Sequence, residues 1–524
     1  MKTNLPQPPL SGSMNVPESL GSRLPQLLLR GSLILFGLIL LYALGGRLIG
    51  MASGSLPADT NVQAQRIGAV VLLVALALGG PLIWRYGRLL RRPAVVALLD
   101  RLRPWHVVAL ALALRLAWVY AADVKQVSDF AIYDNMGWSI SQGQYLFDPT
   151  FVRPSGCSIF FALIFRLFGH NLMAVETALS IVGAINVLLL YRLARILTGN
   201  HAMAILAALL LAISPEGILF ASLLGTDVLF TFLITLALWL LARSATASQT
   251  TVAALLAVAA AGFVLGLGQY VRSTMPLFVA ASLLWLLLVR GSLQRKLARL
   301  AILGTTFLLT ISPIVAHNRQ ELGIWSVTLQ QLSGWSRLVG SNLESRGAWN
   351  KADELLVRAR LDSEPAPDDE LHPVLRRDRA ARQLAHQRWQ ENPSNLLQMI
   401  ATDKVFTLWG QAAFLSVVTD NTRPALLPAA PAIKAAGHLY YMAVACAAGW
   451  ALVLLGLARS TPFSALAVFV WSALLSTLAH MILETQSRYH YTFLPLLCLA
   501  AAAFLVLAMN RNRAEPKAAP DARG

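Results

Sequence analysis

The chain has 524 residues, of which 56% are hydrophobic and only 13% are charged. Apolar runs long enough to cross a bilayer as helices recur along it, as in residues 31–51, which predicts an all-α polytopic membrane protein and excludes the short alternating segments of a β-barrel. The formal charge of +17 could indicate nucleic-acid binding, but basic residues cluster in short loops beside the apolar runs. We therefore attribute the charge to membrane topology and expect no nucleic-acid partner.

About twelve transmembrane helices are predicted, and a shorter apolar stretch at 157–168 fits the membrane interface better than a crossing. The segment up to about Arg30 lacks a cleavage-site pattern, so we expect the first span to be retained. The spans fall near 31–51, 68–86, 105–122, 172–194, 202–221, 225–243, 252–270, 274–290, 297–316, 436–458, 462–483 and 489–509.

The loop between the second and third spans is rich in arginine, which indicates that it is cytoplasmic. Basic residues recur at every second later loop, so the polar stretch 123–156 lies outside, in the periplasm or its equivalent. The predicted location is the bacterial inner membrane, multi-pass, with the active site facing outward. The arginines of the loop are Arg85, Arg88, Arg91, Arg92, Arg101 and Arg103.

Shifts in composition divide the chain into five parts. The mixed-charge region is expected to be a small, mainly helical periplasmic domain with a helix around 374–391. The parts are a cytoplasmic tail with two leading spans (1–104), a transmembrane core that contains the outer loop 123–156 (105–316), the periplasmic region (317–431), the last spans (432–510) and a cytoplasmic tail (511–524).

Asp129 is the leading candidate for chemistry, because it opens a helix-like run in the first outer loop. Ser128 before it would suit an N-cap. An equally good interpretation is that Asp129 only stabilises the start of the helix through the helix dipole. Tyr133 follows one turn later and could share its face, whereas Asp134 points elsewhere.

Arginines at the outer ends of spans are candidates for phosphate binding. Arg153 precedes Pro154 in a fixed turn, and a guanidinium held at the interface suits a phosphate head group. The alternative is that Arg153 is an interfacial arginine that binds the phosphate of ordinary membrane lipids. Other outer-end groups are Asp227, Arg272, and Arg488 with Tyr489, each of which could instead snorkel or cap a helix.

Three further features have plainer interpretations. Arg115 lies inside a span and should face a partner or an aqueous cleft. His480 and Glu484 could ligate a metal by their spacing, but two ligands are a weak signal, and Glu484 is also spaced for an i,i+4 ion pair with Arg488. The three cysteines, Cys157, Cys446 and Cys498, sit in apolar stretches and are expected to pack.

These motifs together resemble the GT-C membrane glycosyltransferases of the family 39 kind, which include protein O-mannosyltransferases and lipid A aminoarabinose transferases. The first outer loop carries the main likeness, in SDFAIYDNMGWSISQGQYLFDPTFVRPSG. The likeness covers roughly residues 105–510. Further motifs follow in order as SLLGTDVLF, GLGQYVRSTMP, SPIVAHNRQELGIWSVTLQQLSGWSRLVGSN, RWQENPSNLLQMIATDKVFTLW and QSRYHYTFLPLL.

The resemblance implies a transferase that uses a polyprenyl-phosphate-linked sugar and an acceptor glycan, lipid or protein outside the membrane. The family's first-loop aspartate falls on Asp129, its basic residue before proline on Arg153, and its late arginine–tyrosine pair on Arg488 and Tyr489. The sequence departs from the family at Ser155, where a second proline is usual, and at Val152, which is acidic in the aminoarabinose branch and can bind metal there. No cofactor is predicted, and a divalent metal is left open.

The hypothesis for the mechanism is a single inverting displacement with Asp129 as base. A lipid phosphate leaves as a stabilised anion and needs positive charge rather than a general acid, and Arg153, Arg272 and Arg488 would supply it. An O-antigen ligase or polymerase is the second interpretation, although it would not explain the Asp129 loop so early in the core. A transporter of lipid-linked sugars is the third.

Overall fold

The computed structural model describes residues 20–53, 62–87, 93–246, 251–363, 372–458 and 464–510, and within them every regular element is a helix. The elements are α1 (Leu20–Ser53), α2 (Val62–Tyr86), α3 (Pro93–Arg101), α4 (Pro104–Ala122), α5 (Asp129–Ser141), α6 (Gly156–Phe168), α7 (Leu172–Thr198), α8 (His201–Ala212), α9 (Pro215–Leu219), η2 (Phe220–Ser222), α10 (Asp227–Ser244), α11 (Thr251–Val271), α12 (Met275–Leu288), α13 (Leu293–Leu322), α14 (Ser333–Gly340), α15 (Lys351–Ser363), α16 (Pro373–Glu391), α17 (Pro393–Met399), η3 (Ile400–Lys404), α18 (Val405–Trp409), α19 (Leu415–Thr419), η4 (Pro424–Ala429), α20 (Ala430–Leu457), α21 (Leu466–Ile482), η5 (Ser487–Phe493) and α22 (Leu494–Asn510).

The apolar helices confirm the all-α polytopic membrane architecture. In the described residues, eight helices are long and apolar enough to cross a membrane, and a ninth crossing is obtained if the bent pair α8 and α9 counts as one. The predicted number of twelve is not confirmed, because α12 and α21 are shorter apolar helices of 14 and 17 residues and α2, at the predicted span 68–86, is not among the eight. The expected interfacial stretch at 157–168 lies in α6.

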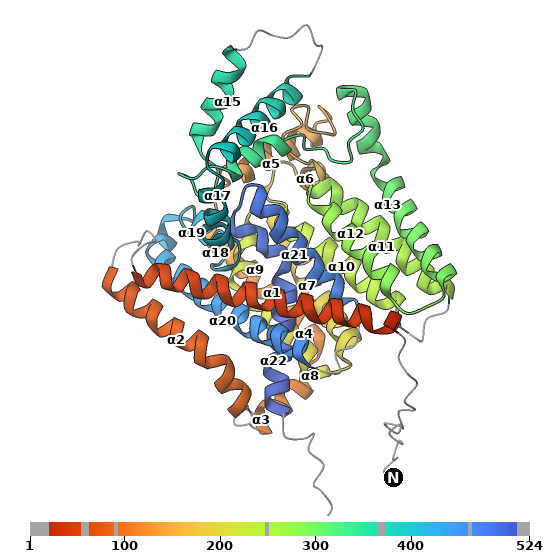
Figure 1. The fold of residues 1–524 in the computed structure, drawn as a ribbon, viewed down its shortest axis with the longest axis vertical. Helices are drawn as coiled ribbons and strands as arrows, with labels where there is room; N and C mark the ends of the chain where they lie inside the picture. The colour runs from red at the N-terminus through yellow and green to blue at the C-terminus, as the bar shows by residue number, and fades with distance from the viewer. Residues whose placement is uncertain are drawn as a thin grey trace, which may run out of the picture.

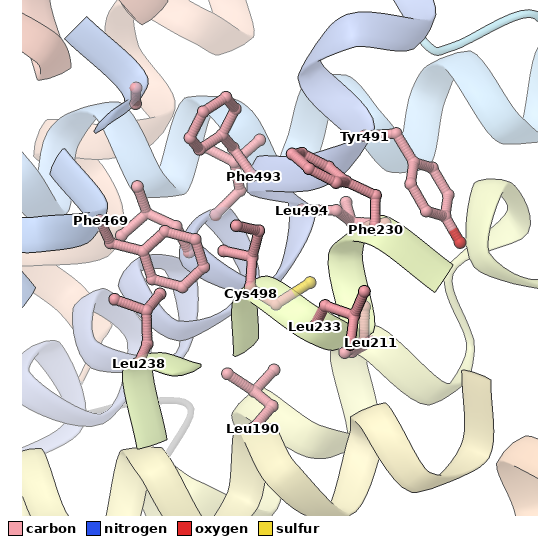
Figure 2. Packing of buried hydrophobic residues seen from close by; sticks show 14 of the residues in the cluster. Leu190, Leu211, Phe230, Leu233, Leu238, Phe469, Tyr491, Phe493, Leu494 and Cys498 are labelled. Atoms are coloured by element: carbon pink, nitrogen blue, oxygen red, sulfur yellow. The ribbon is translucent and has the colours of Figure 1, made fainter. Parts of the chain in front are cut away.

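The main core lies where α22 runs between its neighbours. Figure 2 shows Leu494 and Cys498 of α22 close to Leu211 of α8 and Leu233 of α10. These side chains are almost fully buried, which is expected for the central helix of a bundle whose apolar residues face all round. Cys498 is a packing residue, as its apolar surroundings in the sequence predicted.

A buried arginine stabilises the break between α8 and α9, which meet at an angle of 55°. Arg115 of α4 is 2% exposed, and its guanidinium donates hydrogen bonds to the carbonyls of Leu211 and Ala212 at the end of α8, at 3.4 and 3.2 Å. A cation at a helix C-terminus is favourable because the last carbonyls have no partner in the helix. The partner expected for Arg115 is therefore main-chain oxygen.

A second, smaller core is formed by α14, α15 and α16, of which α15 and α16 lie at the top of Figure 1. It contains Trp335 and Leu338 of α14, Val357 of α15 and Ala381 of α16. The predicted helix around 374–391 is confirmed as α16. Phe151 from the first loop also packs in this core, so the loop that follows α5 is fixed to the helices of the 317–391 region.

Residues C-terminal to α17 pack in the main core and not in the smaller one. Leu408 and Trp409 of α18 and Leu415 of α19 lie in the main core, beside α1 and α20. The predicted domain limits stay predictions.

Candidate functional site

Asp129 is the first residue of α5, and its carboxylate binds two guanidinium groups. Arg153 donates to Oδ1 at 2.6 Å and Arg488 donates to Oδ2 at 2.7 Å. The side chains of Asp129 and Arg153 are each 24% exposed and that of Arg488 is 11% exposed. The site thus holds two cations against one anion, with partial access to solvent.

The turn that carries Arg153 is organised by Asp148. One carboxylate oxygen of Asp148 accepts hydrogen bonds from the backbone amide and the hydroxyl of Thr150, and the other accepts from the amides of Val152 and Arg153, at 3.1 and 2.8 Å. Such side-chain-to-backbone bonds define an Asx-type turn. The guanidinium of Arg153 is therefore presented from a rigid segment.

Gly156 brings this turn close to α11. A Cβ added at Gly156 would lie 2.6 Å from the carbonyl of Tyr270 and 2.8 Å from the amide of Val271. Only glycine allows that approach of two backbones. Arg272, which follows Val271, is held by this contact beside the first loop.

Arg272 joins the site through Tyr489. Arg272 donates to Asp227 at 3.2 Å, and its guanidinium carbon lies 5.3 Å from the centre of the Tyr489 ring. The guanidinium carbon of Arg488 lies 5.8 Å from the same ring. Each guanidinium is attracted to the face of the same ring, while Asp227 and Asp129 supply the counter-charges. Three arginines and two aspartates thus form one cluster.

The backbone is strained around this cluster. Ser128, Phe151 and Phe414 all have positive φ, at 54°, 54° and 32°. Ser128 precedes Asp129, Phe151 lies two residues before Arg153, and the ring of Phe414 lies 5.2 Å from the guanidinium carbon of Arg488. Non-glycine residues in this region cost about 1–3 kcal/mol each and concentrate at functional sites.

The two cations control the ionisation of Asp129. Burial alone would raise the pKa of this carboxyl, but the charges and hydrogen bonds of Arg488 and Arg153 outweigh burial and lower it below the ordinary value. Asp129 is therefore a carboxylate at neutral pH. Glu484 behaves in the opposite way, because burial raises its pKa and the hydrogen bond from Gln486 opposes this only in part.

A cavity of about 320 Å³ opens beside Arg272 and Tyr489. Its walls come from the start of α12, the segment before α14, the end of α21 and η5. Among the side chains that line it are Glu484, His480 and a row of hydroxyl groups. Arg272, one of the three arginines of the cluster, thus borders a space large enough for a small ligand.

Lys404 stabilises one wall of this cavity. It is fully buried, and its ammonium donates to the carbonyls of Gly340, Met481 and Leu483 at 2.9, 2.9 and 2.7 Å. These three acceptors use all three ammonium hydrogens. Lys404 therefore links the end of α14 to the segment that carries Glu484.

The predicted supporting residues lie at different distances from the centre. Asp227 pairs with Arg272 inside the cluster. Tyr133 is buried one turn along α5 from Asp129, and Asp134 points elsewhere, as expected, to His170 at 2.7 Å. Arg115 contacts the end of α8 and does not contact Asp129. The roles proposed for these residues stay predictions.

Two local expectations are wrong. Ser128 occupies the N-cap position but makes no capping bond with its side chain, because its backbone has φ 54° and ψ −130° rather than the extended conformation of an N-cap. Glu484 and Arg488 form no i,i+4 pair, because α21 ends at Ile482 and Arg488 binds Asp129 instead.

The residues present do not fit a divalent metal. His480 donates Nδ1 to the backbone carbonyl of Glu484 at 2.9 Å, so Nε2 and the Glu484 carboxylate are the two possible ligands in the cavity wall, which are too few for a metal site. Both oxygens of Asp129 bind guanidinium groups, and Val152 offers no ligand atom. No group of three His, Cys, Asp or Glu side chains with suitable geometry occurs in the part of the chain that the structure describes.

Sequence reasoning missed Asp148, Lys404 and the position of Glu484 in the cavity wall. Asp148 had a signal, since an aspartate two residues before threonine in a proline-containing loop favours an Asx turn. Lys404 had none, because its three acceptors lie far away in the sequence.

A search of curated protein sequences finds no match. The archaeal oligosaccharyltransferase AglB from Archaeoglobus fulgidus, solved with an inhibitory peptide and a dolichol-phosphate, is 15% identical, with a TM-score of 0.46 over 77% of this chain and 50% of that one. The chain thus spans about half the length of AglB. ArnT from Cupriavidus metallidurans, bound to undecaprenyl phosphate, is 11% identical, with a TM-score of 0.37 over 77% of this chain and 76% of that one.

A family model matches residues 152–317, from the turn of Arg153 into the last part of α13. Its description is dolichyl-phosphate-mannose-protein mannosyltransferase. The family is one of glycosyltransferases, which is the enzyme class that the sequence motifs predicted. The family model thereby confirms the resemblance to the GT-C glycosyltransferases of the family 39 kind over residues 152–317.

Proposed function

We propose that the protein is a membrane glycosyltransferase that moves a sugar from a polyprenyl-phosphate donor to an acceptor hydroxyl. The observation that carries the proposal is the pair of guanidinium groups on Asp129, with the third arginine, Arg272, joined through Tyr489. Arginine binds phosphate in a fixed geometry and is preferred where phosphate is recognised at a partly buried site.

The arginines suit the charge that develops in the reaction. The acceptor oxygen attacks the anomeric carbon and inverts it, and the electron pair of the breaking carbon–oxygen bond leaves with the phosphate. The phosphate group changes from a diester with one negative charge to a monoester with two. Cations fixed beside it before the reaction favour the transition state over the bound donor, because they interact with charge that is still increasing.

Asp129 accepts the proton of the acceptor hydroxyl in this proposal. In the free protein, both of its oxygens bind arginine. When a lipid phosphate binds Arg153 and Arg488, the carboxylate shares these cations with the phosphate and becomes available to the acceptor. The donor therefore binds first, and no step needs a metal ion.

The proposed orientation places this cluster outside the cytoplasmic face of a bacterial inner membrane. The support is the asymmetry of basic residues, since Arg101 ends α3 and Arg103 directly precedes α4, whereas Asp129 follows the other end of α4. The acceptor is accordingly a periplasmic glycan, lipid or protein, and membrane lipids surround the bundle.

The proposal is tested by incubating the purified protein with undecaprenyl phosphates that carry different sugars, in the presence of a membrane extract as acceptor source. We expect release of bare undecaprenyl phosphate from at least one donor, and loss of this release in Asp129→Asn. Movement of donor across a vesicle without release would favour a transporter. Release of undecaprenyl pyrophosphate from an oligosaccharide donor would favour a ligase or polymerase.

A further inference from the structure

Two residues after Arg488, His490 contacts a buried glutamate of α9, Glu216. One oxygen of this carboxyl group, Oε1, lies 3.3 Å from Nε2 of His490 and also accepts the backbone amide of Ala413 at 2.7 Å. Glu216 is 1% exposed and His490 is 0% exposed. A glutamate is rarely buried to this degree unless it is paired, so its partners show which segments it holds.

Glu216 and His490 have one proton to share. Nδ1 of His490 donates to the carbonyl of Leu408 at 2.8 Å, so a neutral ring has no hydrogen on Nε2. A hydrogen bond between Nε2 and Oε1 of Glu216 therefore needs one further proton, on either group, and with it the pair carries no net charge. The other oxygen, Oε2, is buried and has no hydrogen-bond partner among the described residues, where a full negative charge would be costly.

The second segment that Glu216 contacts also surrounds Arg488. Ala413 is followed by Phe414, whose ring lies 5.2 Å from the guanidinium carbon of Arg488. The amide of Phe414 donates to the hydroxyl of Ser487, the residue before Arg488, at 3.4 Å. Glu216 thus joins η5, which carries this arginine, to the segment that packs on its guanidinium.

The conformation of Phe414 makes this link important. Its φ of 32° lies in the left-handed region, which a non-glycine residue keeps only where its surroundings hold it. Oε1 of Glu216 binds the amide before Phe414, and Oγ of Ser487 binds its own amide. Without these bonds the segment would relax, and the guanidinium of Arg488 would lose the ring that packs on it.

We propose that Glu216 is a positioning residue for sugar transfer: it shares one proton with His490, adds no net charge, and fixes Arg488 where the donor phosphate binds. The inference rests on the proposed function. Glu216 does not touch the donor in this proposal and acts through Arg488. A polar pair that only stabilised the fold would have no specific link to this arginine.

The test is a double-mutant cycle that measures binding of bare undecaprenyl phosphate. In Glu216→Gln, the side-chain oxygen still accepts from Ala413 but brings no proton to Nε2 of His490. We expect Kd to rise about 10-fold in Glu216→Gln alone, and to change by less than about 2-fold when the same substitution is added to Arg488→Ala. Thermal unfolding in detergent shows that each variant is folded.

Ser487→Ala decides the test if Glu216→Gln does not fold. It removes the acceptor of the Phe414 amide, so Kd should rise by about 2- to 5-fold when Arg488 is present and stay unchanged in Arg488→Ala. Ser472→Ala is the matched control and should bind as the wild type does. Ser472 is a buried serine of α21 whose hydroxyl donates to Val468 of its own helix.

An unchanged Kd, or an equal rise in Kd with and without Arg488, would overturn this inference and leave the proposed function intact. Tighter binding in Glu216→Gln would also overturn it, because it would show that Glu216 carries a net negative charge that opposes phosphate binding. If the wild type releases no undecaprenyl phosphate from any donor, the proposed function fails, and this inference with it.

Discussion

Arg153 and Arg488 bind different oxygens of a single carboxylate, that of Asp129, although one comes from the first loop and the other from η5, just before α22. The arrangement neutralises one of the two positive charges and leaves the other without a full counter-ion. A site of this kind attracts a phosphate, and the phosphate competes with the aspartate for the same guanidinium groups.

Replacing Asp129 with asparagine should separate catalysis from phosphate binding. We expect the rate of sugar transfer to fall by about 10²- to 10⁴-fold, because the proton acceptor is lost. The same variant should bind bare undecaprenyl phosphate more tightly than the wild type, because both guanidinium groups lose an anionic competitor. Asp134→Asn is the matched control, since Asp134 lies on the same helix but binds His170. Weaker lipid-phosphate binding in Asp129→Asn would contradict competition between the two anions.

The pH dependence of kcat/KM should lack an acid limb from Asp129 between about pH 5 and 8. Burial raises the pKa of Asp129, but Arg488 and Arg153 lower it by more, so the carboxyl takes up a proton only as the pH falls below its ordinary value of 3.8. Because the pKa of Asp129 is lower in the folded protein than in the unfolded chain, the carboxylate stabilises the fold above pH 3.8. This contribution is lost as the pH falls through the folded-state pKa.

Glu484 provides the control for that profile. Its pKa is raised above 4.5, chiefly by burial, so it could add an acid limb at higher pH than Asp129. If the wild type shows a limb above pH 5, it should disappear in Glu484→Gln. A limb that persists in this variant would show that the base has a raised pKa, and it would argue against Asp129.

Replacing Lys404 with methionine should destabilise the protein by about 1–3 kcal/mol, because three buried carbonyls lose their common donor. Burial lowers the pKa of Lys404 to about 7, so the charged form also carries a desolvation cost that the variant avoids. We expect the lost bonds to outweigh that cost. Thermal unfolding in detergent measures the difference, with Lys434→Met as control, because Lys434 makes an exposed pair with Asp420 worth about 0–1 kcal/mol. An equal or higher Tm for Lys404→Met would show that these three hydrogen bonds do not stabilise the protein.

Gly156→Ala should reduce both stability and activity. The added methyl would meet the backbone of Tyr270 and Val271 at 2.6–2.8 Å, so α6 and α11 must separate, at a cost of about 1–3 kcal/mol. Arg153 and Arg272 would move apart with them, and we expect KM for the donor to rise. Gly304→Ala on α13 is the control, because no atom lies within 4 Å of its added Cβ. If Gly156→Ala and Gly304→Ala have equal KM values for the donor, the contact between α6 and α11 does not affect donor binding.

Hydrophobic runs predicted where most helices lie, since burial in a bilayer requires long apolar segments with satisfied backbones. They could not predict the number of crossings, because α12 begins and α21 ends at the cavity, which leaves both helices short, and α8 breaks before Pro215. Such endings depend on tertiary contacts, as with Arg115, whose acceptors at Leu211 and Ala212 are distant in the sequence.

The candidate residues could be found from the sequence, because charges at the ends of spans are costly and few. Their pairing could not, since Asp129, Arg153 and Arg488 meet only when the first loop packs against η5. The i,i+4 rule suggested Glu484 as the partner of Arg488, and it failed because the two residues do not share a helix. Helix spacing is informative only within a helix, and the end of α21 carried no clear sequence signal.

The short lengths of α12 and α21 have a consequence for the surrounding lipid. Helices of 14 and 17 residues rise about 21 and 26 Å, whereas the hydrocarbon core of a bilayer is about 30 Å thick. Both helices border the cavity, so hydrophobic mismatch is concentrated on the side where Arg272 and Glu484 lie. The bilayer would thin there, and a phosphate at the head-group level would sit nearer to the arginines than it does elsewhere on the surface. Acyl-chain length therefore becomes a variable of the reaction, and thicker membranes should slow it by keeping the donor farther from its site.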